Sequence, residues 1–245
     1  MHIGITGSNG FIARHIAETL ERGKNVRLHY FDLPKCDLLN MGDARRFVRG
    51  MDAIVHAAAV NRGTDEEIIA GTVVATHNLI RALRAAKSKA NVIFLSSIQA
   101  ETDTLYGQCK RLGEIMLEDR ARRGGHATIV FRLPNVFGEG SRPFYNSAVA
   151  TFCHQAAKNQ PFIIHRDSKD KPLPLIYVKD AARRIADECF RKRSAPFSIA
   201  RMTPRGSISV GDLAGLIRSF KTMRDPAPLR SKLEKDLYRT YRSFI

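Results

Sequence analysis

Hydrophobic and polar positions divide the first half of the chain into two alternating kinds of segment. Short apolar runs, typical of buried strands, occupy residues 2–6, 26–31, 52–60, 91–97 and 127–133. Between them apolar residues recur every three or four positions, which indicates amphipathic helices; the longest run from about 65 to 87 and from about 104 to 123. Because strands and helices alternate, the sequence predicts an α/β fold, a doubly wound parallel sheet of the Rossmann type.

The pattern changes after Pro134, where glycine and proline interrupt it at "NVFGEGSRPF" and "RDSKDKPLPL". Later segments predict short strands at 161–165, 174–178 and 196–200, helices near 145–158, 179–193 and 210–220, and a basic amphipathic end from Leu229 to Phe244. We therefore expect a dinucleotide-binding part at 1–133. Residues 134–245 of the same continuous unit are expected to form mainly a small substrate-binding cap and closing helices.

Composition limits the possible partners. The formal net charge is +16, but the basic residues are dispersed along helices, as at 80–89 and 118–124, rather than interleaved with aromatic residues there, so we expect no nucleic-acid partner. A solvated surface explains this charge; steering of nucleotide diphosphates and contact with an acidic partner are alternatives. The four cysteines are scattered, which predicts free thiols and no metal site. The first residues enter the fold without a signal-peptide pattern and no apolar run is long enough to span a membrane, so we expect a cytoplasmic protein without a membrane partner.

A glycine-rich turn follows the first predicted strand and opens the first helix. Its pattern is Gly4-x-x-Gly7-x-x-Gly10-x-x-Ala13, which permits a tight turn and close approach of a pyrophosphate to a helix N-terminus. The cofactor is expected to be NADP, with NAD possible. Asp32 after the second strand would bind the ribose 2'-hydroxyl of NAD, although it lies about two residues beyond the usual strand end and suits a turn equally well. The candidate partners of a 2'-phosphate are Arg14, Arg27 and His29.

Candidate chemistry lies behind the fourth strand. Ser96 and Ser97 end that strand, and Tyr106 and Lys110 follow in "LYGQCK". Residues four apart share one helical face, so the ammonium of Lys110 can lower the pKa of the Tyr106 phenol. Such a phenol can exchange a proton with a carbonyl or carbinol oxygen, and a nicotinamide is then needed for the hydride. We assign catalysis to Ser97, Tyr106 and Lys110. Neighbouring strand residues point in opposite directions, so only one of the two serines faces the site, and the place of Ser97 directly before "IQA" resembles that of the catalytic serine in short-chain reductases.

The motifs "TGSNGFIA", "SSIQA" and "YGQCK" together resemble the extended short-chain dehydrogenase/reductase family, many of whose members act on nucleotide sugars. The stretches "VNRG", "LYGQCKRLGE", "PNVFG", "RPFYNSAVATFCH" and "LEKDLYRTYRSF" resemble more narrowly the reductase domain of bacterial capsule-synthesis proteins of the CapF (WbjC) type. This resemblance extends over essentially the whole chain. Two positions depart from the family pattern: Cys109 stands for the serine of "YGxSK", and Thr72 stands for an asparagine.

The resemblance implies an activity. These reductase domains use NADPH to reduce the 4-keto group of a UDP-2-acetamido-2,6-dideoxy-hexos-4-ulose, on the route to UDP-N-acetyl-L-fucosamine. In that family a metal-binding cupin domain performs the preceding epimerisation, and this chain stops at Ile245, close to where that domain would begin. A shortened chain, a split gene and a true single-domain member are all compatible with this end, and a separate cupin epimerase is one expected partner. A homodimer through the helices at 65–87 and 104–123 is expected as well.

The expected binding residues fall into two groups. Residues expected to hold the dinucleotide lie at the strand ends and the glycine turn: Gly7, Asn9, Gly10, Phe11, Ile12, Asp32, Asp37, Leu38, Ala57, Ala58, Ala59, Ser96, Tyr106, Lys110 and Leu133. Residues expected to hold the UDP-sugar, by guanidinium–diphosphate pairing and amide hydrogen bonds, are Asn61, Asn135, Arg142, Tyr145 and Asn146. For Arg132, a place in the cleft and an ion pair at the strand end are equally compatible with the sequence.

Two rival functions remain open at this stage. One is a nucleotide-sugar 4-epimerase or 4,6-dehydratase with bound NAD, which Asp32 favours. Ile98 and Gln99 count against a dehydratase, because such enzymes usually carry an acid pair at these positions. The other rival is a catalytically idle Rossmann-type protein that senses a nucleotide or assembles with a partner.

Overall fold

The computed structural model describes residues 1–23, 25–124, 126–164, 166–193, 195–223 and 229–245. They form two compact units: Met1–Leu133 with Ala182–Met202, and Pro134–Ala181 with Thr203–Ile245. The first unit is thus discontinuous in sequence. Residues 182–202 do not belong with the rest of the expected C-terminal part, because the strand at Phe197–Arg201 pairs in the large sheet of the first unit.

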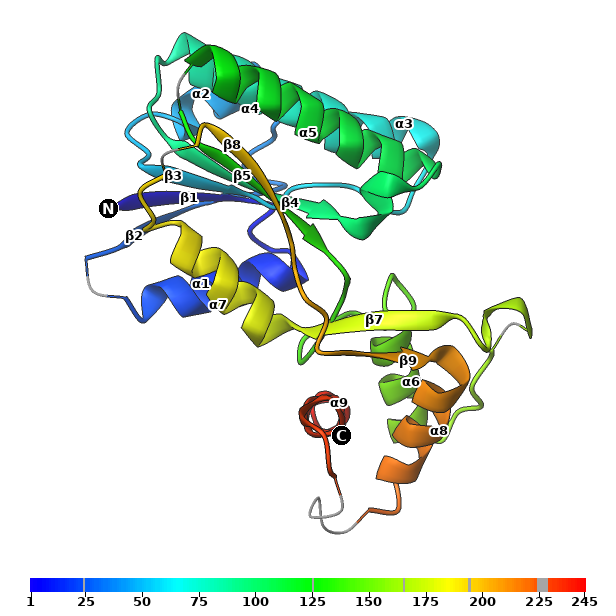
Figure 1. Ribbon diagram of the computed structural model, residues 1–245. Coiled ribbons are helices and arrows are strands. Elements are labelled where there is room, and N and C mark those ends of the chain that lie inside the picture. Colours follow the sequence, from blue (N-terminus) through cyan, green and yellow to red (C-terminus); the bar gives the residue numbers. More distant parts are fainter. Residues whose placement is uncertain (24, 125, 165, 194, 224–228) are drawn as a thin grey trace. The chain divides into compact units, whose positions relative to one another are not determined.

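A parallel sheet forms the centre of the first unit (Figure 1). Its strands are β1 (His2–Thr6), β2 (Arg27–Phe31), β3 (Ala53–His56), β4 (Asn91–Ser97), β5 (Thr128–Leu133) and β8 (Phe197–Arg201). Among the described residues the order is β2-β1-β3-β4-β5-β8, and every neighbouring pair is parallel. All residues of β3 and β5 are buried, as in a sheet covered on both faces. The predicted fold class is confirmed.

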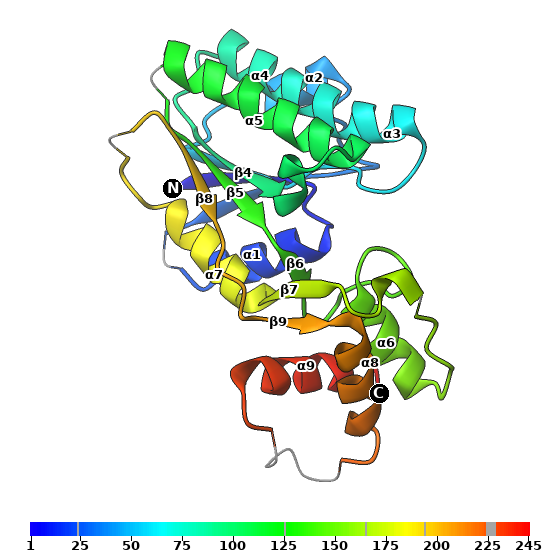
Figure 2. The same cartoon turned by 45° about the vertical axis from the view of Figure 1, so that its right-hand side comes forward.

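Helices cover both faces of this sheet, as Figures 1 and 2 show. They are α1 (Phe11–Glu21), α2 (Met41–Phe47), α3 (Asp65–Ile69), α4 (Ala75–Ala85), α5 (Leu105–Gly124) and α7 (Val178–Glu188), with a short 3-10 helix η2 (Ile98–Glu101). Ala13, Ile16, Ala17 and Leu20 recur at helical spacing and are the buried residues of α1. Side chains of α2, α4 and α5 form a core with β3 and β4 that includes Phe47, Leu79, Phe94 and Leu117.

The predicted single helix over 65–87 is wrong in one respect. A π-helical turn, η1 (Ala70–Val74), separates α3 from α4. A Cβ on Gly71 would lie 2.3 Å from Cγ2 of Val60, so the helix and the preceding loop come unusually close there. The hydroxyl of Thr72 donates to the carbonyl of Val60 at 3.1 Å. This packing coincides with the widened turn, and π turns of this kind are frequent at functional sites.

The second unit contains a smaller sheet and its own core. Its elements are β6 (Asn135–Phe137), α6 (Ala148–Ala157), η3 (Arg166–Ser168), β7 (Pro172–Tyr177), β9 (Gly206–Ser209), α8 (Val210–Phe220) and α9 (Lys232–Arg242). Strand β7 pairs with β6 in parallel and with β9 antiparallel. Phe137, Phe152, Leu213, Phe220 and Tyr241 belong to the core that joins this sheet to the three helices.

Two details of the second unit differ from the prediction. Residues 161–164 form no strand although their apolar side chains suggest one, and His165 lies outside the described residues. No local pattern indicated β6 or β9. Both are short strands that pair with β7, and their pairing comes from tertiary context, which weak local patterns do not encode.

Candidate active site

The glycine turn between β1 and α1 has the geometry that a bound pyrophosphate needs. Gly7 has φ +64, and a Cβ there would lie 2.7 Å from the Ala58 backbone, so both its conformation and its surroundings require glycine. The Gly10 N–H donates to the Gly7 carbonyl at 2.9 Å, which closes the turn. Gly10 also precedes Phe11 and Ile12, whose free helix N-terminus is suited to an anion. These residues fit a dinucleotide.

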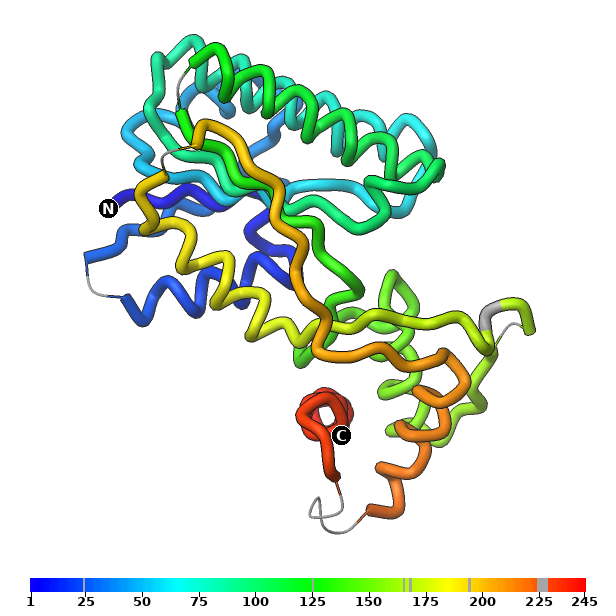
Figure 3. The backbone as a smooth tube through the Cα atoms, in the orientation of Figure 1, coloured from blue at the N-terminus to red at the C-terminus, as the bar shows by residue number. Residues whose placement is uncertain are grey.

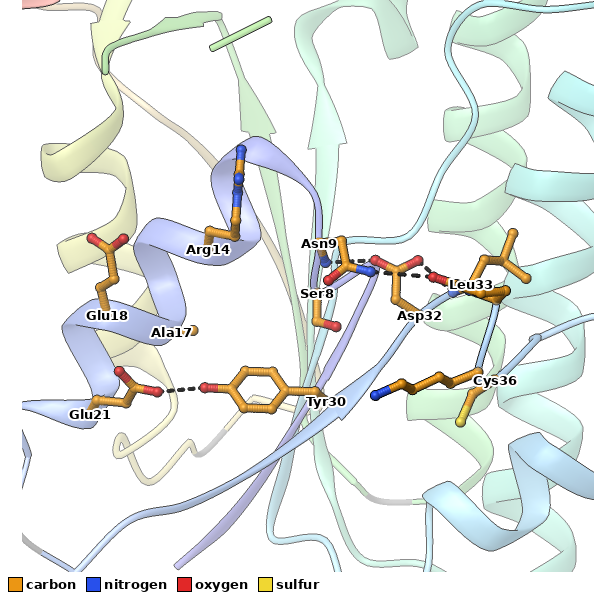
Figure 4. Close-up of a pocket in the computed structure, with 12 residues that line it drawn as sticks. Ser8, Asn9, Arg14, Ala17, Glu18, Glu21, Tyr30, Asp32, Leu33 and Cys36 are labelled. Carbon is orange, nitrogen blue, oxygen red and sulfur yellow. Dashed lines mark hydrogen bonds between the residues drawn. The ribbon is translucent and has the colours of Figure 1, made fainter. Parts of the chain in front are cut away.

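Asp32 is the residue expected at the adenosine end of such a cofactor. Strand β2 ends at Phe31, so Asp32 is the first residue after the strand and not two positions beyond its end. Its Oδ2 accepts the backbone N–H of Asn9 at 2.6 Å, and its Oδ1 accepts that of Leu33 at 2.8 Å (Figure 4). The carboxylate is thereby held against the glycine turn, which is where a ribose hydroxyl would lie.

A pocket of about 540 Å³, within the range of small-molecule sites, opens beside this carboxylate. Residues from the glycine turn, α1 and the end of β2 line it: Ser8, Asn9, Arg14, Ala17, Glu18, Glu21, Tyr30, Asp32, Leu33, Pro34, Lys35 and Cys36. The hydroxyl of Tyr30 donates to Glu21 at 2.6 Å across the pocket (Figure 4). Arg14 and Lys35 give the pocket two cations. Arg27 and His29, the other candidate phosphate partners, are not among its lining residues.

The other expected adenosine contacts have partners of their own. Oδ1 of Asp37 accepts the N–H of Leu39 at 2.8 Å, as in an Asx turn. The Leu38 side chain is buried in the core of the first unit, so a ligand can meet only the backbone of this residue. Ala57, Ala58 and Ala59 follow β3 and are half-buried, and the backbone of Ala57 and Ala58 lies against the glycine turn. These assignments stay predictions.

The turn between β4 and α5 packs η2, which Ser97 caps, against the start of the helix that carries Tyr106. Ser97 ends β4, and its Oγ accepts the N–H of Gln99 at 3.1 Å, which caps η2. A Cβ on Gly107 would lie 2.1 Å from the Gln99 carbonyl oxygen, so η2 packs directly on the start of α5. Gly107 thus explains the "YG" pair: it lets the strand end approach the helix at Tyr106. Leu133 lies opposite Ser97 in the parallel register of β4 and β5.

Lys110 lies one helical turn after Tyr106 and is 2% exposed. Its Nζ donates to the Leu95 carbonyl at 2.7 Å and lies 4.7 Å from the ring centroid of Phe94 and 5.9 Å from that of Tyr106. Burial lowers the pKa of Lys110 to about 7, and the charge of Glu114 opposes this shift. Holding the charged ammonium beside the Tyr106 ring therefore costs desolvation free energy, which the charge of Glu114 offsets only in part.

We expect Lys110→Met to reveal this cost in the pH dependence of stability. With a folded pKa near 7 and an unfolded value near 10.5, the unfolded chain binds the extra proton between these pH values, so stability rises with pH in that window. The free energy of unfolding of the wild type, relative to Lys110→Met, should increase by about 2 to 3 kcal/mol from about pH 7 to about pH 9. Urea titrations at several pH values measure it, and parallel curves for the two proteins would contradict the assignment.

A buried ionic network fixes α5 to the sheet and was not predicted as a unit. Oε1 of Glu114 accepts the Ser96 hydroxyl at 2.6 Å and Nε of Arg132 at 2.9 Å. Its Oε2 accepts a second bond from Arg132 at 2.5 Å and one from Arg111 at 2.9 Å. Arg132, left open by the sequence, is therefore an ion-pair partner. Tyr106, Lys110 and Glu114 are spaced four residues apart, so they lie on one face of α5. This spacing was the sequence signal that could have placed Glu114 beside the site.

Ser96 and His56 complete the surroundings of the site. The Ser96 hydroxyl donates its hydrogen bond to Glu114, so contact of Ser96 with a cofactor would have to come from its backbone. His56, also missed from sequence, is buried and lies between the hydroxyls of Thr6 at 2.7 Å and Thr76 at 3.0 Å. Burial lowers the pKa of His56 to about 3, and Lys110 adds to the effect. This histidine is thus a neutral packing residue.

The expected sugar-nucleotide residues divide between the two units. In the first, Oδ1 of Asn61 is buried and has no hydrogen-bond partner among the described residues, as expected of a ligand-binding amide. In the second, the Arg142 guanidinium lies 5.4 Å from the ring centroid of Tyr145, and both are exposed. Asn146 is exposed, and Asn135 donates to the Pro174 carbonyl at 3.2 Å. Arg142 and Tyr145 are thus brought together; the other roles stay predictions.

The described residues contain neither a metal-binding cluster nor a membrane-spanning helix. Within the described ranges, no group of three or more His, Cys, Asp or Glu side chains is arranged to hold a metal ion. In the same part of the chain, no helix combines the length and apolarity that crossing a membrane requires.

A parallel six-stranded sheet with a glycine turn after its first strand defines a Rossmann-type protein. Residues 3–186 match the NAD dependent epimerase/dehydratase family, and the chain belongs to this family. A curated relative, UDP-2-acetamido-2,6-beta-L-arabino-hexul-4-ose reductase of Pseudomonas aeruginosa, is 35% identical over 249 residues, covering 100% of this chain and 65% of the relative. The chain thus spans about two thirds of that relative's length.

Solved structures are similar over the whole chain. The capsular polysaccharide assembling protein CapF from Staphylococcus aureus has a TM-score of 0.80 and 26% identity, covering 100% of this chain and 65% of that protein. UDP-glucose 4-epimerase of Thermus thermophilus, in complex with NAD, has a TM-score of 0.85 and 18% identity. The match covers 100% of this chain and 99% of the epimerase, which shows that the fold is shared. These findings confirm the resemblance read from the sequence.

Proposed function

We propose that this chain reduces the 4-keto group of a UDP-linked 4-keto-6-deoxy-N-acetylhexosamine, in the synthesis of a capsule or O-antigen sugar on the UDP-N-acetyl-L-fucosamine route. The observation that carries the proposal is the intact set of Ser97, Tyr106 and Lys110 at the end of β4 and the start of α5. The relative named as a reductase of such a hexulose, 35% identical over this whole chain, supports the substrate class.

Each catalytic residue has its own role in the reduction of the carbonyl group. A bound reduced nicotinamide supplies the hydride. Tyr106 gives its phenolic proton to the carbonyl oxygen as negative charge develops there, and Ser97 donates a hydrogen bond to the same oxygen. Lys110, held by the Leu95 carbonyl, keeps positive charge beside the phenol and faces the place of the ribose. Asn61, Asn135, Arg142, Tyr145 and Asn146 are proposed to hold the UDP-sugar.

The test follows the absorbance of the reduced cofactor while purified protein meets UDP-4-keto-6-deoxy-N-acetylhexosamine isomers. Loss of absorbance with one isomer, and formation of the 4-hydroxy product in stoichiometric amount, is expected. Interconversion of UDP-sugars without net consumption of cofactor would instead establish the epimerase alternative. Binding of cofactor without turnover of any isomer would establish the idle nucleotide-sensing alternative, and both outcomes would refute the proposal.

We propose NADPH as the preferred cofactor, because Arg14 and Lys35 line the same pocket as Asp32 and can meet a 2'-phosphate. Asp32 itself supports NADH, the alternative. Lys35→Ala is expected to raise KM for NADPH about tenfold and to leave KM for NADH unchanged. Asp32→Ser should lower kcat/KM for NADH about tenfold. Steady-state kinetics with both cofactors measures the effects, and equal effects of Lys35→Ala on both cofactors would contradict the assignment.

A homodimer is proposed through α3, η1 and α5, which pack side by side. Ile69, Val74, Leu112 and Ile115 are 42%, 39%, 43% and 48% exposed on these elements. Such apolar side chains are expected to be covered by a second copy. Leu112→Glu with Ile115→Glu should convert the dimer to a monomer in light scattering at micromolar concentration, whereas Ile163→Glu, 73% exposed in the second unit, should not. A wild-type monomer would contradict the proposal.

The reaction is proposed to take place in the cytoplasm, since Cys36, Cys109, Cys153 and Cys189 are free thiols, as is usual in a reducing compartment. A separate cupin epimerase is proposed to supply the substrate. The similarity of this chain to a CapF protein supports this proposal. Coupled turnover of the isomer mixture with and without such an epimerase tests it.

A further inference from the structure

The positive charge of this chain is unevenly distributed between the two edges of the large sheet. All strands of this sheet run in parallel, so they begin at one edge, and the intervening helices return to that edge with their C-terminal ends (Figures 1 and 3). Five connections there lead into β2, β3, β4, β5 and β8: residues 22–26, 48–52, 86–90, 125–127 and 189–196. We call the described residues of these connections the basic edge.

Cations predominate at the basic edge. Its lysines and arginines are Arg22, Arg49, Lys87, Lys89, Arg191, Lys192 and Arg193, against Asp52 as the acid of its described residues. All of these cations except Arg193 are exposed. Arg191 and Arg193 pair with the buried Glu188, while Arg22, Arg49, Lys87, Lys89 and Lys192 form no ion pair with another described residue. The final turns of α2, α4 and α5 contain Arg45, Arg46, Arg84, Arg122 and Arg123 beside these connections. Of these, Arg46, Arg84, Arg122 and Arg123 pair with Asp43, Asp119 or Glu118, so the excess charge comes from the connections themselves.

The opposite edge has the reverse balance. The connections that leave β1, β2, β3 and β4, residues 7–10, 32–40, 57–64 and 98–104, hold the proposed cofactor site. Their acids are Asp32, Asp37, Glu101 and Asp103, and their cations are Lys35 and Arg62. A field that steers nucleotide diphosphates would concentrate cations at this edge. Because the cations lie at the other edge, they suit a second, anionic partner.

The shape of the basic edge indicates the kind of partner. Its cations extend along the width of a six-stranded sheet, roughly 25 Å, so they match an extended anionic surface better than a single acidic side chain. Phe190 is 52% exposed in the same edge, next to Arg191 and Lys192. Cations around an exposed aromatic side chain are the combination by which proteins bind the interface of an anionic bilayer.

We propose that the basic edge binds anionic phospholipid headgroups, with the Phe190 ring entering the interface. Each exposed lysine or arginine near such a surface strengthens binding about fivefold. In this orientation the opposite edge, with the glycine turn and Asp32, points away from the bilayer and stays open to cofactor. The proposal concerns a peripheral contact and is independent of the proposed reaction.

The experiment is sedimentation of the purified full chain with vesicles of phosphatidylglycerol and phosphatidylcholine, and with vesicles of phosphatidylcholine alone. The edge variant carries Arg49→Glu, Lys87→Glu, Lys89→Glu and Lys192→Glu. The matched control carries Lys221→Glu, Lys232→Glu, Lys235→Glu and Arg242→Glu, which reverse the same number of exposed charges in the second unit. The control also tests α9, the other basic amphipathic surface.

The wild type and the control variant should bind the anionic vesicles, and the edge variant should bind about two to three orders of magnitude more weakly. Phe190→Ser should weaken binding about tenfold, and high salt should release the wild type. Equal losses in the edge and control variants, or tighter binding to duplex DNA or to an acidic protein than to the vesicles, would overturn the proposal. If the edge variant does not fold, Lys89→Gln with Lys192→Gln provides the same comparison.

Discussion

Tyr106→Phe is expected to reduce turnover of the keto-sugar by about three orders of magnitude, while the affinity for reduced cofactor stays within about twofold of wild type. The substitution removes one oxygen and its proton, and it keeps the ring that lies 5.9 Å from the Lys110 ammonium. The carbonyl oxygen then gains charge in the transition state without a proton donor. Tyr106 is one of several residues expected to contact the cofactor, and its ring is kept; the larger part of the affinity is expected from the glycine turn and Asp32, which the substitution does not touch.

Single-turnover kinetics with saturating cofactor measures this prediction without interference from product release. Tyr238→Phe in α9 is the matched control and should leave the rate unchanged. Ser97→Ala is expected to have a smaller effect than Tyr106→Phe, because the proton donor remains and one hydrogen bond to the oxygen is lost. A Tyr106→Phe protein with at least a tenth of the wild-type rate would show that another group donates the proton.

Glu114→Gln should lower the free energy of unfolding by about 3 kcal/mol, and Glu114→Ala by more. The Glu114 carboxylate is 1% exposed and accepts hydrogen bonds from Ser96, Arg111 and Arg132. Its loss leaves the guanidinium of Arg132, itself largely buried, without its main counter-charge. Glu118→Gln, one turn further along α5, is the matched control: its pair with Arg122 lies at the surface and should contribute less than about 1 kcal/mol.

Acid should erase the difference between Glu114→Gln and wild type. Burial alone would raise the pKa of Glu114, but hydrogen bonds from Arg132, Ser96 and Arg111 outweigh it, so this pKa is lowered below 4.5. A lowered folded pKa means that the stabilisation is present above 4.5 and is lost as the pH falls through the folded value. Denaturant titrations of both proteins from neutral pH downward measure this convergence. Equal stabilities already at neutral pH would show that the network contributes nothing net.

Those parts of the site that are local in sequence could be predicted from its motifs. The parts that depend on contacts between distant residues could not. The Gly7 turn and the Tyr106–Lys110 pair could be read because their residues are neighbours on one turn or one helix. The link between Glu114 and Arg132 joins residues on α5 and β5, and no local pattern distinguishes it from a surface pair. The π turn at Ala70–Val74 coincides with a close contact to Val60, which lies outside the helix. The apolar residues at 161–164 fit a strand pattern, yet they form no strand in the folded protein.

The discontinuity of the first unit has a consequence for its biosynthesis. Strand β8 completes the large sheet beside β5, and its Arg201 pairs with Glu101, which in turn pairs with Arg132. A ribosome that has released only residues up to Leu133 has therefore delivered a sheet whose fully buried strand β5 is still an open edge. Strand β5 stays an unpaired edge strand while more than sixty further residues, from Pro134 to Phe197, are translated. A chaperone that shields β5 during this interval should raise the yield of native protein more than one that acts on the finished chain.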